Sequence, residues 1–327
     1  MNTSLSLLCS LSAIASLQAA DLRIGIIGLD TSHVGAFTQL LNDPADKNHV
    51  PGGKVVAAFK GGSPDIESSR NRVDKYTAEL ESKFGVKILP SIEALCAEVD
   101  VVLLESVDGR PHLSQVRPVF QAKKPVFIDK PLAGTLKDAI EIYRLGKAAG
   151  VPWFSSSSYR YYESLVTLKN TDVGRVRSVI SYGPCEKESH HPDLYWYGVH
   201  ATEALFTLLG TGCESVSRTA TPDTDVVVGT WSEGRTGTLL GLRTGATPHK
   251  VIVFGTKAVA EQQGDGDYAP LVRQIMKFYQ TGIAPIPPEE TIEMFAFMEA
   301  ADESKRQGGR PVTIAEVLKR NGWSAAK

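Results

Sequence analysis

The sequence lacks the features that mark several special classes of protein. Its 327 residues include only four cysteines and no C-x-x-C pair, which excludes a disulfide-rich scaffold. No block of lysine and arginine occurs, and the formal charge of −2 argues against nucleic acid as the main partner. Repeats are absent, and with 42% hydrophobic residues the chain can form the cores of about two globular domains.

Charge is also missing from the first 20 residues. The apolar run from Leu5 to Leu17 is too short to span a bilayer and ends near two small residues, Ala19 and Ala20. We therefore expect residues 1–20 to be a signal peptide without a basic start, which directs the protein to the periplasm or the medium, with no transmembrane anchor. If the segment is not cleaved, it is a buried N-terminal helix of a cytoplasmic protein.

Residues 21–150 alternate short apolar runs with helical patterns. The expected strands are 22–28, 55–59, 99–104 and 125–129, and the expected helices are 31–41, 74–84, 112–122 and 135–149. The apolar runs are continuous rather than alternating, which is typical of strands buried on both faces of a parallel sheet. The pattern predicts an α/β domain of the Rossmann type, a doubly wound sheet that binds dinucleotides.

The pattern changes in residues 151–327. Five β-rich runs follow one another with few helices between them, at 176–182, 215–220, 225–231, 236–242 and 250–254. They predict an α+β domain with an open, mostly antiparallel sheet that binds the substrate. We expect a homo-oligomer through this sheet. The helix at about 288–306 could pack back on the first domain.

The turn after the first strand departs from the dinucleotide motif G-x-G-x-x-G. Gly28 occupies the first position, but Asp30 and His33 replace the other two glycines. A carboxylate beside a pyrophosphate is unfavourable unless it turns away or finds a cation. Asp30 could cap the following helix. A loose phosphate site made by Thr31, Ser32 and backbone N–H groups is compatible with that capping.

The end of the second strand lacks the carboxylate that binds the ribose of NAD. Lys60 and Ser63 stand there instead and would favour the 2′-phosphate of NADP. Alternatively, Lys60 is a solvated loop residue. The sequence therefore predicts NAD or NADP, with a preference for NADP.

Two short motifs follow in the chain. Residues 112–134 contain the motif Asp129-Lys130-Pro131, and Gly198-Val199-His200 starts a later helix. Together with Arg160 in S-S-S-Y-R-Y-Y, these segments resemble the glucose–fructose oxidoreductase, inositol dehydrogenase and MocA (Gfo/Idh/MocA) family. The resemblance covers nearly all of residues 21–327. It implies an NAD(P)-dependent oxidoreductase that takes hydride from a hydroxyl of a sugar or cyclic polyol.

The resemblance assigns catalysis to Lys130 and His200. Lys130 follows a buried strand, at the edge of an open α/β sheet where ligands bind. A cationic nicotinamide nearby would favour the neutral amine, which could exchange a proton with a substrate hydroxyl. The alternatives are a surface lysine and a hydrogen-bonded core histidine. Trp196 occupies the position of the family's aspartate, so Asp193, Tyr195, Trp196 and Tyr197 are the candidates for substrate contacts, together with Arg160, which could instead cap a helix.

Four more residues are expected at the cofactor because of the resemblance: Ser106, Asp108, His112 and Asp129, beside Gly28, Asp30, Thr31, Ser32, His33, Lys60 and Lys130. No metal site is expected, since His190 and His191 have no second ligand cluster at a suitable spacing. Two other functions stay open. One is a redox-neutral lyase or glycosidase with a tightly bound cofactor, and the other is a sugar-binding relative without a cofactor.

Overall fold

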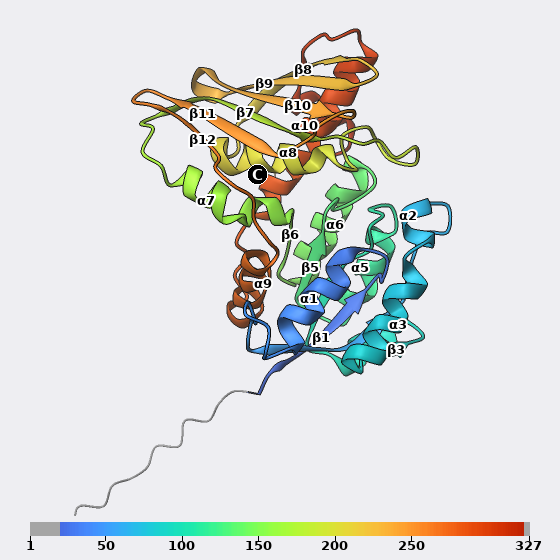
Figure 1. Ribbon diagram of the computed structural model, residues 1–327. Coiled ribbons are helices and arrows are strands. Elements are labelled where there is room, and N and C mark those ends of the chain that lie inside the picture. The colour runs from blue at the N-terminus through green and yellow to red at the C-terminus, as the bar shows by residue number, and fades with distance from the viewer. Residues whose placement is uncertain (1–19, 324–327) are drawn as a thin grey trace, which may run out of the picture.

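The computed structural model describes residues 20–323. The predicted signal peptide lies outside this range, apart from Ala20, and so does Cys9. Within residues 20–323, no helix has both the length and the apolar character needed to cross a bilayer. Figure 1 shows two layered domains, one around each of two sheets.

The first sheet has six parallel strands in the order β3-β2-β1-β4-β5-β6. The strands are β1 (Leu22–Ile27), β2 (Gly53–Phe59), β3 (Lys87–Leu89), β4 (Val101–Leu104), β5 (Val126–Asp129) and β6 (Trp153–Ser156). The order reverses between β1 and β4, where dinucleotide folds bind their ligand. The predicted Rossmann-type sheet is confirmed.

Helices cover both faces of this sheet. They are α1 (Ser32–Asn42), α2 (Glu67–Arg70), α3 (Val73–Phe84), α4 (Ile92–Glu98), α5 (His112–Gln121) and α6 (Leu136–Ala149). A helix from late in the chain, α9 (Ala269–Thr281), shares an apolar core with α1 and β1. Its Tyr279 hydroxyl donates a 2.5 Å hydrogen bond to the carbonyl of Val102 in β4. The first domain therefore includes α9, a helix from the part of the chain that was predicted to form the second domain.

The second sheet has seven strands in the order β12-β11-β7-β10-β9-β8-β13. They are β7 (Val176–Pro184), β8 (Cys213–Ala220), β9 (Thr224–Trp231), β10 (Arg235–Leu242), β11 (Lys250–Gly255), β12 (Val259–Glu261) and β13 (Val312–Thr313). Among the described strands of this second sheet, only the β7–β10 pair is parallel. The predicted open, mostly antiparallel sheet is therefore confirmed. Short helical segments complete the domain: η1 (Ser158–Tyr161), α7 (Glu163–Lys169), η2 (Ser232–Gly234) and α11 (Ile314–Arg320).

Two helices, α8 (Gly198–Leu209) and α10 (Pro288–Arg306), cover one face of the second sheet. The opposite face is open, and Val226 and Val228 of β9 are exposed there. Helix α10 is apolar around most of its circumference because it also contacts α6 and β6 of the first domain.

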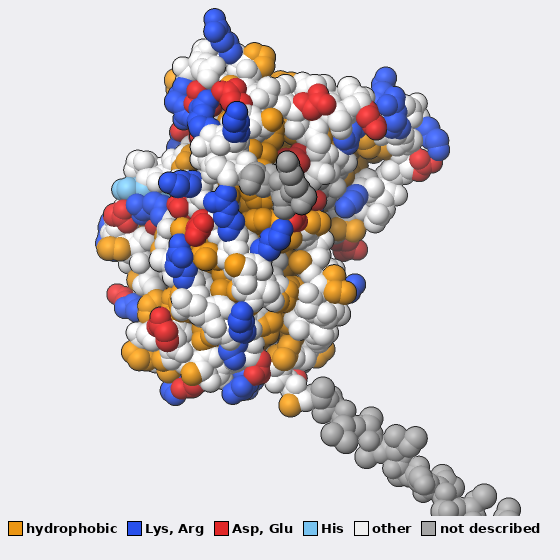
Figure 2. Space-filling model, turned by 180° about the vertical axis from the view of Figure 1, so that it is seen from behind, with side chains coloured by type: hydrophobic (Ala, Val, Ile, Leu, Met, Phe, Trp, Pro, Cys, Tyr) orange, Lys and Arg blue, Asp and Glu red, His pale blue; other side chains and the backbone are white. Residues whose placement is uncertain are grey.

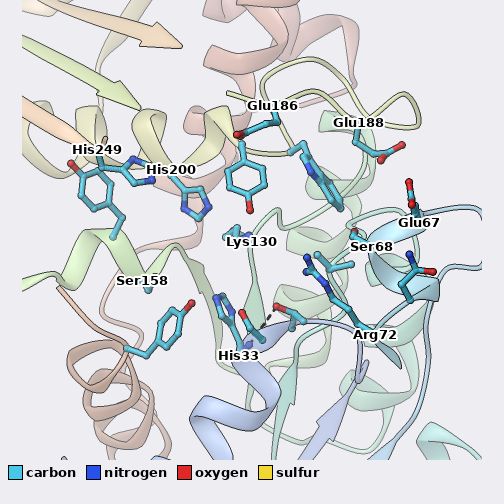
Figure 3. A pocket seen from close by; sticks show the side chains of 18 of the residues that line it. His33, Glu67, Ser68, Arg72, Lys130, Ser158, Glu186, Glu188, His200 and His249 are labelled. Atoms are coloured by element: carbon cyan, nitrogen blue, oxygen red, sulfur yellow. Dashed lines mark hydrogen bonds between the residues drawn. The ribbon is translucent and has the colours of Figure 1, made fainter. Parts of the chain in front are cut away.

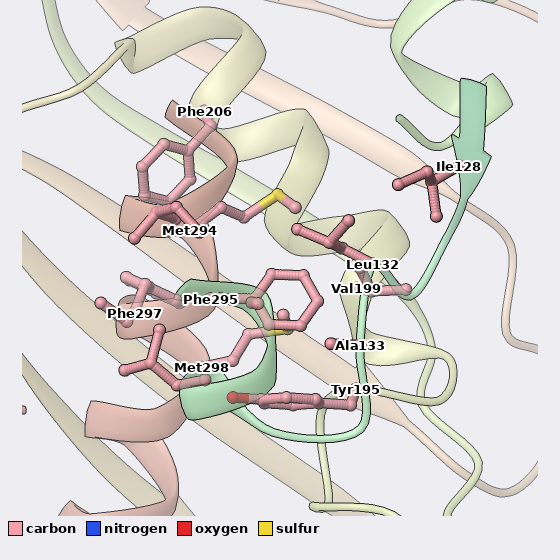
Figure 4. Packing of buried hydrophobic residues seen from close by; sticks show 14 of the residues in the cluster. Ile128, Leu132, Ala133, Tyr195, Val199, Phe206, Met294, Phe295, Phe297 and Met298 are labelled. Carbon is pink, nitrogen blue, oxygen red and sulfur yellow. The ribbon is translucent and has the colours of Figure 1, made fainter. Parts of the chain in front are cut away.

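The core between the two domains contains the segment that follows β5. Leu132 and Ala133 are fully buried beside Phe295 of α10 (Figure 4). Burying a side chain of the size of Phe295 contributes about 1.5–3 kcal/mol to folding. This packing fixes the position of the chain immediately after Lys130, the predicted catalytic residue.

Candidate active site

A cavity of about 630 Å³ lies at the carboxyl edge of the first sheet, where the second domain covers it. Residues from both domains line it (Figure 3): Thr31, Ser32, His33, Glu67, Ser68, Asn71, Arg72, Val107, Lys130, Ser158, Tyr159, Tyr162, Glu186, Glu188, Trp196, Tyr197, His200, His249 and Tyr268. The predicted residues Thr31, Ser32, His33, Lys130, Trp196, Tyr197 and His200 thus lie around one cavity.

Lys130 follows β5 directly, and its peptide bond to Pro131 is cis. Its Nζ atom lies 5.8 Å from the centroid of the Tyr197 ring. No salt bridge to Lys130 occurs among the residues that the structure describes. The ammonium group is therefore available to a ligand in the cavity.

His200 lies across the cavity from the first sheet, near the start of α8. Burial and the charge of Lys130 lower its pKa well below the usual value, so the ring is neutral. Its Nδ1 atom is 2.7 Å from the Ser157 hydroxyl, which fixes the orientation of the ring. His249, whose ring centroid is 5.6 Å away, is neutral as well, because burial lowers its pKa to about 4. The two imidazole rings that face Lys130 across the cavity, those of His200 and His249, are therefore uncharged.

Below Lys130 lies a buried cluster of His33, Glu105 and Asp129. His33 Nδ1 lies 2.8 Å from Asp129 Oδ2 and 3.6 Å from Glu105 Oε2. Burial opposes a charge on His33, but the two carboxylates outweigh it and raise its pKa. Burial together with the charge of Asp129 raises the pKa of Glu105. Burial would also raise the pKa of Asp129, but His33 and Lys130 outweigh this and lower it. The cluster therefore places an unusual concentration of ionisable groups at the point where the strand order reverses.

The turn after β1 is built around Gly28 and Asp30. Gly28 has φ +87°, and a Cβ there would lie 2.5 Å from the backbone nitrogen of Ser106, so only glycine fits. Thr31, not Asp30, caps α1, because the Thr31 hydroxyl accepts from the amide of His33. The capping interpretation of Asp30 is wrong.

Asp30 instead turns away from the cavity and is fully buried. It accepts hydrogen bonds from the Ser69 hydroxyl at 2.6 Å and from the Val107 amide at 3.0 Å. Nearby, the Ser63 hydroxyl donates to Asp108 at 2.6 Å. We call Asp30, Ser63, Ser69 and Asp108 the loop bridge, since they join the loops after β2 and β4.

Several predicted cofactor contacts belong to this bridge or to the core. Ser106, Asp108 and His112 are each no more than 1% exposed and are bonded to protein groups. Hydrogen bonds from Arg110 and Ser63, together with the nearby His191 ring, outweigh burial and hold the pKa of Asp108 well below its usual range. None of the three lines the cavity, so the structure corrects their assignment as direct contacts. They position the loop after β4.

The region of the cavity at the start of α1 fits a dinucleotide better than the region at the end of β2. The first turn of α1 opens into the cavity beside Lys130, which suits the phosphates and the nicotinamide. The adenosine end would extend toward the end of β2, where the loop bridge crosses the sheet edge. Gly61 lies so close to the turn that a Cβ on it would be 3.1 Å from the Cα of Gly28. The loop after β2 therefore packs closely against the turn after β1.

Three predicted substrate contacts do not line the cavity and have protein partners instead. Arg160 is bonded to Glu203 and Glu290 in a buried ion-pair network between η1, α8 and α10. Asp193 accepts from Arg218 at 2.8 Å and from Lys305 at 2.6 Å. Tyr195 is fully buried, with its ring centroid 4.9 Å from that of Phe295 (Figure 4).

Lys60 also has a protein partner, since its Nζ atom lies 2.6 Å from Asp74 in an exposed ion pair. The choice between NAD and NADP stays a prediction. His190 and His191 are paired with carboxylates of Glu188 and Asp108.

The sequence analysis missed residues that line the cavity from late in the chain. Tyr268 precedes α9, and His249 precedes β11; neither belongs to a motif. Glu105 carried a usable signal, because it follows a buried strand as Lys130 does. The same rule that selected Lys130 would have selected it.

The features above define a class of protein: a two-domain α/β protein with a Rossmann-type nucleotide-binding domain and a polar cavity beneath an α+β domain. Comparison with known families gives a more specific assignment. The model of GFO_IDH_MocA, described as an oxidoreductase family with an NAD-binding Rossmann fold, matches residues 22–156. This match covers less than half of the chain, and it shows an NAD-binding Rossmann domain of the kind found in the Gfo/Idh/MocA oxidoreductase family.

Individual relatives are distant. Inositol 2-dehydrogenase 3 of Saccharopolyspora erythraea is 25% identical over 181 residues, which are 52% of this chain and 47% of the relative. The match thus spans about half the length of that enzyme. A probable dehydrogenase from Thermotoga maritima has 22% identity and a TM-score of 0.73 over 90% of this chain and 100% of its own. Myo-inositol 2-dehydrogenase from Lactobacillus plantarum has 17% identity and a TM-score of 0.72 over 90% and 99%. These two structures establish the shared fold.

Proposed function

We propose that the protein is an NAD(P)-dependent oxidoreductase that removes hydride from a hydroxyl-bearing carbon of a sugar or cyclic polyol. The observation that carries this proposal is the position of Lys130. Its ammonium group has no salt-bridge partner among residues 20–323 and lies in a cavity shared by a nucleotide-binding domain and a second domain. A lysine in this position can exchange a proton with a substrate hydroxyl.

The surroundings of Lys130 support this role. The neutral His200 ring can accept or donate a hydrogen bond to the same hydroxyl without adding charge. The aromatic rings of Trp196 and Tyr197, which line the cavity, offer surfaces for a sugar ring. The relatives named as inositol dehydrogenases act on a cyclic polyol, which agrees with this substrate class. When bound, the nicotinamide would accept the hydride.

Release of bound nucleotide gives a direct test. Purified protein is denatured, the supernatant is assayed for NAD(H) and NADP(H), and a thermal-shift titration with each nucleotide is run in parallel. The proposal expects release of one nucleotide or a rise in melting temperature with it. Reduction of added NAD(P)+ by a panel of sugars and polyols would then identify a net dehydrogenase. The absence of both nucleotide release and a thermal shift would refute the proposal.

A sugar-binding relative without a cofactor is the second candidate. The loop bridge favours it, because Asp30, Ser63 and Asp108 cross the edge where adenosine would lie. This candidate expects sugar binding by calorimetry with no effect of either nucleotide. A redox-neutral enzyme with a tightly bound cofactor would instead release nucleotide and form product without net reduction. It is the version that export of the protein would favour.

We also propose that two copies associate through the open face of the second sheet. Val226 and Val228 are 39% and 40% exposed on adjacent outward positions of β9. Light scattering coupled to size-exclusion chromatography tests this. The double variant Val226→Lys, Val228→Lys is expected to be monomeric, whereas a wild-type monomer would refute the proposal.

A further inference from the structure

We propose that His33, Glu105 and Asp129 form a binding site for one divalent metal ion at the base of the cavity. The three side chains come from the start of α1 and from the carboxyl ends of β4 and β5. One ligand atom of each lies within 4.8 Å of the others. Ligands that share one metal ion, at bond lengths of about 2.0–2.2 Å to nitrogen and oxygen, also have their ligand atoms within this distance of one another.

The contact between His33 and Asp129 has the geometry of two ligands rather than of a donor and an acceptor. The atoms are 2.8 Å apart, yet His33 Nδ1 has no hydrogen-bond partner of acceptable angle. The imidazole nitrogen and the carboxylate oxygen therefore do not point at each other. A shared ion beside both atoms accounts for their proximity and for their direction.

Unpartnered oxygens point to the same conclusion. Both oxygens of Glu105 and Oδ1 of Asp129 are buried and accept no hydrogen bond, although Glu105 is 0% exposed. Buried carboxyl oxygens that accept no hydrogen bond are unfavourable, and in proteins such oxygens are paired or coordinate a metal. Lys130 directly follows Asp129, but it forms no salt bridge with either carboxylate among the described residues.

The donor set restricts the ion. One imidazole and two carboxylates suit Zn²⁺, Mn²⁺ or Fe²⁺ better than Ca²⁺, which prefers six to eight oxygens. Three protein ligands leave a coordination position for water or a substrate oxygen. His33 lines the cavity, so this position faces the ligand that Lys130 meets. An ion there would polarise a substrate hydroxyl or carbonyl oxygen. The site does not depend on the proposed hydride transfer.

Metal content of the untagged protein gives the test. The chain is stripped with EDTA and dialysed against Zn²⁺, Mn²⁺ or Co²⁺, and bound metal is measured by mass spectrometry, with the visible spectrum of Co²⁺ as a second readout. The wild type is expected to bind about one equivalent in this cluster. The variant Glu105→Gln keeps the shape of the side chain but loses its charge. Loss of a residue that only orients a metal ligand lowers metal affinity by roughly 10–100-fold. Because Glu105 is itself a proposed ligand, Glu105→Gln should lower the affinity by more than this.

Two controls keep the test decisive. Glu93→Gln changes an exposed glutamate on α4 and should bind like the wild type. Asp129→Asn provides a second ligand variant if Glu105→Gln does not fold, as judged by circular dichroism. A wild type that takes up none of the three ions overturns the proposal and leaves a proton shared within the cluster as the counter-charge. Unchanged affinity in both ligand variants overturns it as well.

Discussion

The hydroxyl of Ser63 donates a 2.6 Å hydrogen bond to Oδ2 of Asp108, which joins the loop after β2 to the loop after β4. In a Rossmann-type sheet these two loops border the crevice that receives the adenosine end of a dinucleotide. The contact is buried, since both residues are less than 9% exposed. On the face shown in Figure 2, basic and acidic side chains are interspersed.

Weakening the loop bridge should strengthen dinucleotide binding. The double variant Ser63→Ala, Ser69→Ala removes three buried hydrogen bonds, each contributing about 1 kcal/mol to the loop bridge. We expect the dissociation constant for NAD(H) or NADP(H), measured by fluorescence titration, to fall by at most roughly 100-fold. The control Ser82→Ala removes an exposed hydroxyl on α3 and should change nothing. Weaker binding by the double variant would show that the bridge supports the nucleotide site.

Lys130→Met should abolish turnover while nucleotide binding persists. Loss of a positioned acid–base group lowers kcat by about 10²–10⁴-fold. The measurement is steady-state turnover, with nucleotide affinity determined in parallel. Lys137→Met, an exposed lysine on α6, serves as the matched control. Turnover of Lys130→Met at the wild-type rate would remove this lysine from the proposed role.

Arg160→Gln should destabilise the protein. Arg160 neutralises Glu203, which is only 1% exposed, and loss of one partner of a buried ion pair costs about 3–5 kcal/mol. Urea denaturation measures the loss. The double variant Arg160→Leu, Glu203→Leu should recover most of it, because it removes the buried Glu203 carboxylate and leaves only Glu290, which is more exposed, without its partner. Wild-type stability together with a large rise in KM would restore Arg160 as a substrate contact.

Acidification should destabilise the fold through the buried histidines. Burial lowers the pKa of His249 from 6.5 to about 4, so the unfolded chain takes up a proton that the folded chain refuses. The free energy of unfolding therefore falls as the pH drops from 6.5 to 4, by at most roughly 3 kcal/mol for this group. His200 acts in the same direction.

Urea denaturation at a series of pH values tests this dependence. His249→Gln should flatten the loss of stability between pH 6.5 and 4, and the control His49→Gln should not. His49 is half-buried and bonded to the carbonyl of Leu40, away from the cavity. An unchanged slope in His249→Gln would show that another group dominates.

Sequence alone determined four of the six strands of the first sheet, five of the seven strands of the second, and the order of the two domains; the short strands β3, β6, β12 and β13 were not predicted. Continuous apolar runs can be satisfied only by a sheet covered on both faces, and alternating runs by a sheet covered on one. The same local rule placed Lys130 at the edge of the sheet. The resemblance selected His200 for the opposite wall, and the structure brings both to one cavity.

Tertiary structure decided which polar residues face the ligand. Arg160, Asp193 and Tyr195 lie close in sequence to site residues, yet partners on β8 and α10 draw them into the core or into ion pairs. Such partners are about 25–130 residues away, so no local pattern records them. Asp30 is the clearest case. The sequence identified it as a departure from the glycine motif, but only the fold supplies Ser69 and Val107, whose hydrogen bonds turn its carboxylate away from the cavity.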